Sequence, residues 1–269
     1  MDFVCFNGSF VPATEPLFTA QNRSFRYGDG VFETMKVCNG KIMLEQFHFE
    51  RLVLSLKLLQ IKNTLDPLSL SQLILELCRR NNCVDRARTR LAAFRNSENK
   101  VEFVIEANSL SKEMYQWNEK GLTIDLFPYA RKNADALSNL KTASFLPYVL
   151  AELFAKERGI DDAVVLNAYN NLADTSKANI FLIIKNEIFT PALNQGCVAG
   201  VMRRYILEQL KNSYRVHLDE ISEEKLLTAD EVFLTNSIFD IRWVEKFRQK
   251  IYTSTKALTF YQQIIAPLY

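Results

Sequence analysis

The sequence is poor in histidine, lacks paired cysteines and contains no long apolar run. Only two of its 269 residues are histidine, which argues against a metal site or a catalytic triad built on histidines. Its five cysteines form no C-x-x-C pair and are odd in number, a pattern typical of reduced thiols. No apolar run approaches the roughly 20 residues that a membrane helix needs. We therefore predict neither a bound metal nor a membrane span.

The charges of the chain nearly cancel. Thirty-three Lys and Arg residues against 31 Asp and Glu residues leave a net charge of +2. Such a balance gives no reason to expect nucleic acid or an anionic membrane as a partner. The N-terminus, with Asp2 in second place and an early Asn7-Gly8 turn, shows no cleavable signal. We expect a cytoplasmic protein that acts on a small molecule.

Turn signals and hydrophobic periodicity divide the chain into strands and helices of an α+β protein. The dipeptides Asn7-Gly8 and Asn39-Gly40 each predict a turn between two short strands. Helical spacing follows from His48 and again over residues 68–82, and the segments 88–96 and 100–107 read as strands. A polar stretch before residue 120 predicts two domains, residues 1–119 and 120–269.

A lysine and an aspartate stand out in the second predicted domain. Asp174, within LADTSKANIF, follows Lys141 by 33 residues. Pyridoxal phosphate is held as a Schiff base by a lysine amine, and a carboxylate beside its ring nitrogen keeps that nitrogen protonated. Lys141 precedes a predicted helix whose inward apolar face would be formed by Phe145, Val149, Leu150, Leu153 and Phe154. The alternative for Lys141 is an ordinary solvated lysine before a helix.

Five stretches in a fixed order carry a resemblance to a known family. They are RYGDGVFETMKV, HFERLVLSLKLLQI, LADTSKANIF, GVMRRYILEQL and ADEVFLTNSIFDIRWV. The chain resembles class IV (fold-type IV) pyridoxal phosphate enzymes, the family of branched-chain and D-amino-acid aminotransferases and aminodeoxychorismate lyases. The resemblance implies a two-domain α+β fold with mixed sheets and flanking helices, like that of D-amino-acid aminotransferases. It also implies pyridoxal 5'-phosphate as the cofactor, bound between the domains, and a homodimer.

The resemblance also assigns roles to individual residues. Lys141 would be the Schiff-base lysine and general base, and Asp174 would face the ring nitrogen, where the family usually has glutamate. Arg51 matches a phosphate-binding arginine, for which a planar guanidinium is well suited. Two backbone loops would also reach the phosphate, and their residues are Gly200, Val201 and Met202 at a helix N-terminus, then Ser237 and Ile238.

The reaction favoured by the resemblance is that of 4-amino-4-deoxychorismate lyase, which releases pyruvate and 4-aminobenzoate. GVFET resembles the lyases, Phe32 replaces a tyrosine common in D-amino-acid aminotransferases, and Leu146 replaces a tyrosine of branched-chain enzymes. Arg90 and Arg95, together with Phe32, are the candidates for binding substrate, the alternative for both arginines being a structural role. Two other functions stay open: an aminotransferase for branched-chain or D-amino acids with 2-oxoglutarate, and a binding module that has lost turnover.

Overall fold

A computed structural model describes residues 2–111, 114 and 116–269. The chain divides into two compact units. Unit 1 consists of Met1–Tyr115 and Leu140–Phe145, and unit 2 of Gln116–Asn139 and Leu146–Tyr269. The segment that carries Lys141 therefore belongs to unit 1. The domain limits 1–119 and 120–269 stay a prediction.

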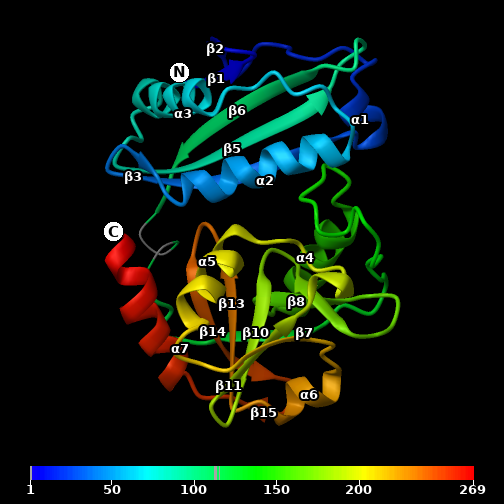
Figure 1. Ribbon diagram of the computed structural model, residues 1–269, viewed down its shortest axis with the longest axis vertical. Helices are drawn as coiled ribbons and strands as arrows, with labels where there is room; N and C mark the ends of the chain where they lie inside the picture. The colour runs from blue at the N-terminus through cyan, green and yellow to red at the C-terminus, as the bar shows by residue number, and fades with distance from the viewer. Residues whose placement is uncertain (1, 112–113, 115) are drawn as a thin grey trace. The chain divides into compact units, whose positions relative to one another are not determined.

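Unit 1 is an antiparallel sheet with helices on one face. Its strands lie in the order β2-β1-β6-β5-β3-β4 (Figure 1). Both predicted Asn-Gly turns take the positive φ angles that such hairpins require, 47° and 90° at Asn7-Gly8 and 49° and 70° at Asn39-Gly40. The strands are β1 (Phe3–Phe6), β2 (Ser9–Pro12), β3 (Gly30–Cys38), β4 (Lys41–Ile42), β5 (Arg86–Arg95) and β6 (Val101–Ser109), and the helices are α1 (Arg23–Tyr27), α2 (Glu45–Leu58) and α3 (Pro67–Arg80).

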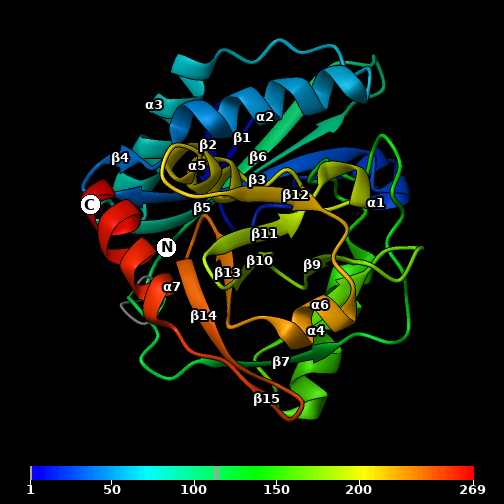
Figure 2. The same ribbon diagram turned by 60° about the horizontal axis from the view of Figure 1, so that its bottom comes forward.

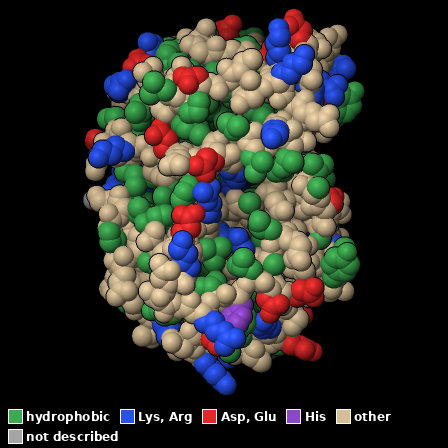
Figure 3. All heavy atoms as spheres, in the orientation of Figure 1, with side chains coloured by type: hydrophobic (Ala, Val, Ile, Leu, Met, Phe, Trp, Pro, Cys, Tyr) green, Lys and Arg blue, Asp and Glu red, His purple; other side chains and the backbone are tan. Residues whose placement is uncertain are grey.

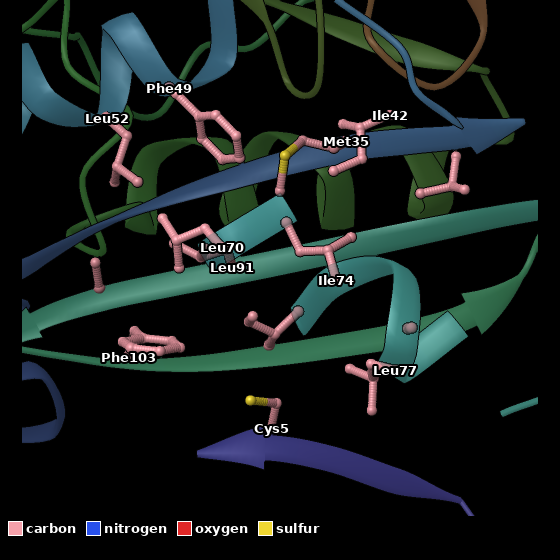
Figure 4. Close-up of a cluster of buried hydrophobic side chains, with 14 of the residues drawn as sticks. Cys5, Met35, Ile42, Phe49, Leu52, Leu70, Ile74, Leu77, Leu91 and Phe103 are labelled. Carbon is pink, nitrogen blue, oxygen red and sulfur yellow. The ribbon is translucent and has the colours of Figure 1, made fainter. Parts of the chain in front are cut away.

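Strand alternation decides which side chains of unit 1 are buried. Met35 of β3 and Leu91 of β5 point to the same face and are fully buried. Figure 4 shows that α2 and α3 complete this core with side chains such as Leu52 and Ile74. Phe32 and Arg90 have the opposite parity, so their side chains lie on the other face of the sheet. That face carries several of the predicted site residues.

Unit 2 contains a mixed sheet with flanking helices. Its strand order is β12-β11-β10-β13-β14-β7-β8-β9, with β15 paired to β14; β11/β12, β14/β7 and β7/β8 run parallel. The strands are β7 (Leu122–Leu126), β8 (Asp162–Leu166), β9 (Leu172–Thr175), β10 (Asn179–Ile184), β11 (Glu187–Pro191), β12 (Val216–Asp219), β13 (Glu231–Asn236), β14 (Asp240–Phe247) and β15 (Lys250–Ile251). The helices are α4 (Leu146–Arg158), α5 (Val201–Leu210), α6 (Glu223–Thr228) and α7 (Thr255–Phe260).

Aromatic packing joins the helices of unit 2 to its sheet. Phe181 of β10 stacks on Phe233 of β13 with ring centroids 4.8 Å apart, and Phe260 of α7 meets Phe233 edge to face. Figure 2 shows α7 beside β14 accordingly. The predicted α+β class with mixed sheets and flanking helices is confirmed.

The surface carries charges of both signs. Figure 3 shows Lys and Arg side chains interspersed with Asp and Glu on the face in view, as the near-zero net charge suggests. In the part of the chain that the structure describes, no helix is long and apolar enough to cross a membrane.

The predicted inward face of the helix after Lys141 is wrong. Val149, Leu150 and Leu153 are 47%, 40% and 54% exposed, although Phe154 is buried as predicted. Helix α4 instead turns Tyr148, Ala151, Phe154 and Ala155 inward. The reason is tertiary, because Phe154 packs against the ring of Phe127 and Tyr148 is tied to a buried carboxylate described below. The helix thus leaves an apolar row outside, consisting of Leu146, Val149, Leu150 and Leu153.

Candidate active site

A buried ionic cluster links β3 and α2 in unit 1. The Glu33 carboxylate accepts hydrogen bonds from Nε and Nη2 of Arg51, at 2.8 and 2.5 Å. It also lies 2.6 Å from Nδ1 of His48. His48 and Arg51 are three residues apart in α2, so both side chains leave the helix on one side. The alternation of β3 turns Glu33 toward them. Arg51, predicted to bind phosphate, therefore has two of its nitrogens on Glu33.

Burial and charge act in opposite directions within this cluster. Burial alone would raise the pKa of Glu33, but the charge and hydrogen bonds of Arg51 and the contact with His48 lower it to about 2. Burial lowers the pKa of His48, which Glu33 opposes. A neutral His48 that donates Nδ1–H to Glu33 keeps a lone pair on Nε2. This buried atom has no hydrogen-bond partner among the described residues.

Backbone hydrogen bonds place the segment of Lys141 beside β3. The Phe32 N–H donates to the Lys141 carbonyl and the Ala143 N–H donates to the Gly30 carbonyl, both at 2.9 Å. Glycine is required at position 30, because a Cβ there would lie 2.7 Å from the Ala93 carbonyl oxygen. The lysine segment is thus attached to the first residues of β3.

Three of the predicted site residues meet around one aromatic ring. Lys141 Nζ lies 4.5 Å from the centroid of the Phe32 ring, and the guanidinium carbon of Arg90 lies 4.6 Å from it. Phe145 packs edge to face on the same ring at 5.3 Å. Arg90 also approaches Glu106 on the neighbouring strand at 3.6 Å. Two cations therefore share the ring of Phe32.

Arg95, the other predicted substrate arginine, is held by protein acceptors. Its Nε donates to Asp29 at 2.9 Å, and its two Nη atoms donate to the Leu59 and Gln60 carbonyls at 2.7 and 3.1 Å. The Asn99 side chain accepts a further hydrogen bond. This arginine ties β5 to the segment after α2. Its role toward a substrate stays a prediction, and the proposals below do not depend on it.

Asp174 is the centre of a buried polar cluster in unit 2. Its Oδ2 accepts from Tyr148 at 2.6 Å, from the Val198 N–H at 3.0 Å and from Lys132 Nζ at 3.1 Å. Its Oδ1 accepts from Asn179 at 2.8 Å, the residue that the LADTSKANIF motif places five positions later. The carboxylate is 2% exposed. Strand β9 and the start of β10 thus supply a fixed, buried carboxylate.

The N-terminus of α5 lies next to this carboxylate. Gly200 is the N-cap of α5, and no side chain caps the helix there. A Cβ at Gly200 would lie 1.9 Å from Asn179 Oδ1, so only glycine allows the helix to start so close to the Asp174 cluster. The first amides of the helix, including those of Val201 and Met202, point out of this end and suit an anion.

The loop after β13 is closed by its own asparagine. The side chain of Asn236 accepts from the Ile238 and Phe239 amides, at 2.9 and 3.0 Å, which forms a compact turn. Ile238 is buried and Ser237 is partly exposed. The predicted phosphate contact of this loop stays a prediction, with the Ile238 amide already engaged by Asn236.

The sequence of the chain decides the family. Residues 30–247 match the model described as amino-transferase class IV. The chain belongs to this family. The match runs from the first residue of β3 to the last of β14, so every predicted site residue from Phe32 to Ile238 lies within the class IV region. The resemblance inferred from the sequence is thereby confirmed.

Relatives within class IV differ in the reactions that they are named for. An aminodeoxychorismate lyase of Vibrio harveyi is 31% identical over 231 residues, 82% of this chain and 83% of that protein. A D-alanine aminotransferase of Staphylococcus epidermidis is 25% identical over 259 residues, 91% of this chain and 89% of that protein. The branched-chain aminotransferase structure of Thermoproteus uzoniensis superposes with a TM-score of 0.88 at 22% identity, over 99% of this chain and 95% of that one. This superposition confirms the predicted fold-type IV architecture.

Three residues of the two clusters were not predicted as site residues, namely His48, Lys132 and Tyr148, and the contact of Glu33 with Arg51 was not predicted either. The spacing of His48 and Arg51 in HFERL could have indicated a shared helix face. Alternation in VFETM could have placed Glu33 on the core side with Met35. No local pattern marks Lys132 or Tyr148, because their contact with Asp174 arises only in the folded sheet.

Proposed function

We propose that the chain binds pyridoxal 5'-phosphate through Lys141, Asp174 and the N-terminus of α5, with Arg51, Ser237 and Ile238 as further ligands. A buried carboxylate suits a pyridine nitrogen, and a helix start without a side-chain cap suits a phosphate. The buried Nε2 of His48 has no hydrogen-bond partner among the described residues and suits a bound polar group, and the charge of Lys141 acts on the same imidazole. The residues present therefore fit this cofactor.

The reaction that we propose is the 4-amino-4-deoxychorismate lyase reaction. The observation that carries it is that Arg90 and Lys141 both lie beside the ring of Phe32. The substrate bears its amine on a carbocycle and a carboxylate across that ring, rather than on the carbon bonded to nitrogen. A guanidinium and a lysine amine beside one aromatic ring, 4.6 and 4.5 Å from its centroid, offer separate contacts to the carboxylate and the amine of one small substrate. The lyase relative at 31% identity supports the same assignment.

The chain's own residues then have distinct tasks. When bound, the cofactor draws electrons from the carbon that carries the substrate nitrogen. Lys141 Nζ takes the proton from that carbon, and Arg90 holds the carboxylate. The ether C–O bond on the neighbouring carbon breaks, the enolpyruvyl group leaves as pyruvate, and the ring becomes aromatic. Phe32 and Phe145 shield Lys141 from water on the side where their rings lie.

An aminotransferase for branched-chain or D-amino acids is the second candidate. The D-alanine aminotransferase relative favours it. A protein of this fold without turnover is the third candidate, motivated by aspartate in place of the family's usual glutamate at position 174. Retention of Lys141 and Arg51 weighs against the loss of turnover.

Absorbance and product release separate the three candidates. We expect a near-visible band in the purified protein that Lys141→Ala abolishes, and release of pyruvate from aminodeoxychorismate. The band without pyruvate, together with amino transfer to 2-oxoglutarate, would replace the lyase by an aminotransferase. A band without either reaction would identify a protein that has lost turnover. If no band appears even after pyridoxal phosphate is added, the cofactor assignment is wrong.

Arg90 can be tested with a matched neighbour. Arg90→Gln should raise KM for aminodeoxychorismate about tenfold or more, because one charged contact to the carboxylate is lost. Arg88→Gln, two residues away on the same strand and more exposed, is the control and should leave KM unchanged. Equal effects of the two substitutions would rule out a specific contact through Arg90.

A homodimer, implied by the class IV resemblance, is also part of the proposal. The apolar row on α4, Leu146, Val149, Leu150 and Leu153, supports it, since clustered exposed apolar side chains mark protein contacts. Light scattering of the purified protein should give twice the 31.0 kDa mass of the chain. A monomeric mass across the micromolar range would contradict the proposed dimer.

A further inference from the structure

The donors around Asp174 are distributed unequally between its two oxygens. Oδ2 receives three of them, from Tyr148, Val198 and Lys132. Oδ1 receives Asn179 alone among the described residues. Oδ1 is therefore the oxygen with capacity for another donor, such as a protonated ring nitrogen.

Lys132 is the cation that faces this carboxylate. Its Nζ lies 3.1 Å from Oδ2 and 5.1 Å from the centroid of the Tyr148 ring, and its side chain is 11% exposed. Every one of these contacts lies within unit 2. A buried carboxylate and ammonium at this distance largely neutralise each other.

The other titratable groups near Asp174 stay neutral or point elsewhere. Burial, and then the Asp174 charge, raises the pKa of Tyr148 well above its ordinary value. Burial, and then Asp174, raises the pKa of the Cys197 thiol to about 12. Arg203, on α5, donates Nη2 to the Pro191 carbonyl at 2.8 Å. Lys132 is thus the charged group bonded directly to the carboxylate.

We propose, on the basis of the proposed cofactor site, that Lys132 is a positioning residue that partly neutralises the charge of Asp174. The cofactor's ring nitrogen then holds its proton less tightly than it would beside a carboxylate that has no cationic partner. The three donors on Oδ2 also fix the orientation of the carboxylate. This arrangement gives the shorter aspartate a defined direction where the family usually has a glutamate.

The consequence for the reaction concerns its driving force. A ring nitrogen that holds its proton less tightly draws electrons less strongly. A reaction that ends in an aromatic product gains its driving force from that product and tolerates a weaker electron sink. Lys132 therefore favours the lyase over reversible amino transfer at the same site.

The test follows the protonation of the ring nitrogen directly. Holoenzyme is prepared with 15N-labelled pyridoxal phosphate, and the nitrogen chemical shift is recorded against pH for the wild type and for Lys132→Met. We expect the titration midpoint to rise by at least about one pH unit in the variant, since an opposite charge at this range moves a pKa by about one to three. Lys177→Met, an exposed lysine three residues from Asp174, is the matched control and should leave the midpoint unchanged.

Two more variants keep the outcome decisive. Lys132→Gln removes the charge but keeps a polar side chain, and it serves in place of Lys132→Met if that variant does not fold. Tyr148→Phe removes a donor without removing a charge, so its midpoint should stay close to that of the wild type. Identical midpoints in the wild type and in the charge-removing variant would overturn the role of Lys132 and make it purely structural.

The same experiment separates this inference from the proposed function. Asp174→Asn should lower the midpoint below that of the wild type, because the carboxylate itself is lost. An unchanged midpoint in Asp174→Asn would show that Asp174 does not face the ring nitrogen, which removes the proposed anchor and Lys132 with it. Failure of the wild type to form any holoenzyme would refute the cofactor proposal itself.

Discussion

Glu33 in unit 1 and Asp174 in unit 2 are both buried carboxylates that contact a cation, and the two arrangements differ. Glu33 in unit 1 meets a guanidinium that binds both of its oxygens, at 2.8 and 2.5 Å. Asp174 in unit 2 meets an ammonium on one oxygen, at 3.1 Å, and neutral donors otherwise. A guanidinium is a planar fork that matches both oxygens of a carboxylate, whereas an ammonium is a compact point charge on a flexible stem.

This difference corresponds to two different tasks of the carboxylates. The Glu33 cluster fixes Arg51 and His48 relative to β3, the strand that also pairs with the lysine segment. The Asp174 cluster leaves capacity on Oδ1 for a ligand. The first carboxylate holds other side chains in place, and the second is the group that we propose faces the cofactor.

Removal of each carboxylate gives the sharpest contrast between the units. Glu33→Ala should cost about 3–5 kcal/mol of the free energy of unfolding, because the buried guanidinium of Arg51 stays charged without its partner. Asp174→Ala should cost less, about 2 kcal/mol, because the flexible stem of Lys132 can carry its ammonium toward water. Urea denaturation of the cofactor-free variants measures both values. Equal losses would show that the two clusters do not differ as described.

Acid should act on the unit 1 cluster in a defined window. The pKa of Glu33 lies at about 2 in the folded protein against an ordinary 4.5. Because the folded pKa is depressed, the contribution of Glu33, up to about 3 kcal/mol, is complete above pH 4.5 and is lost as the pH falls toward 2. Glu33→Gln should flatten the fall in stability over this window. The same slope in the variant and in the wild type would assign the acid sensitivity to other groups.

Two neighbouring residues of α4 test which face of this helix is inside. Phe154→Ala should cost about 3 kcal/mol, since its buried ring packs against Phe127. Leu153→Ala, at a position that is 54% exposed, should cost less than about 0.5 kcal/mol in the monomer. Thermal or urea unfolding reports both. A large loss for Leu153→Ala at low protein concentration would restore the face predicted from the sequence.

The close approach of α5 to the unit 2 cluster predicts a smaller effect. Gly200→Ala would push a Cβ against Asn179 Oδ1, displacing a donor of Asp174, and should cost about 2 kcal/mol. It should also weaken the binding of pyridoxal phosphate, measured by fluorescence titration. Gly159→Ala is the control, with open space around its Cβ but a φ of +65°, and should cost about 1 kcal/mol without affecting the cofactor. Unchanged cofactor affinity in Gly200→Ala would remove α5 from the proposed site.

The smallest effect is expected for the surface ion pair of unit 1. Arg90 and Glu106 lie 3.6 Å apart with side chains 34% and 47% exposed, so Glu106→Gln should change stability by less than about 0.5 kcal/mol. The same substitution should lower KM for an anionic substrate, because the acidic competitor of Arg90 is removed. A rise in KM would indicate that Glu106 orients Arg90 for binding.

The two hairpins and the class IV family could be predicted from the sequence, because the residues that indicate them are adjacent in the chain. Asn-Gly at positions 7–8 and 39–40 requires positive φ angles that only a few residues accept, and the structure has them. The prediction of the inward face of α4 was wrong because residues distant in the chain decide which side of this helix is buried. Most of its residues are apolar enough to suit either side, and the contact of Phe154 with Phe127 and the hydrogen bond from Tyr148 to Asp174 decide which side is buried.

The sequence by itself determined the family, the lysine and aspartate proposed for the cofactor, and the glycine before α5, since each lies in a motif of contiguous residues. The tertiary structure alone decided the partners of these residues. Arg51 is turned to Glu33 and Lys132 to Asp174 by strands and helices distant in the chain. Burial then makes those contacts strong, because a charge removed from water must be met by whatever group the fold brings beside it.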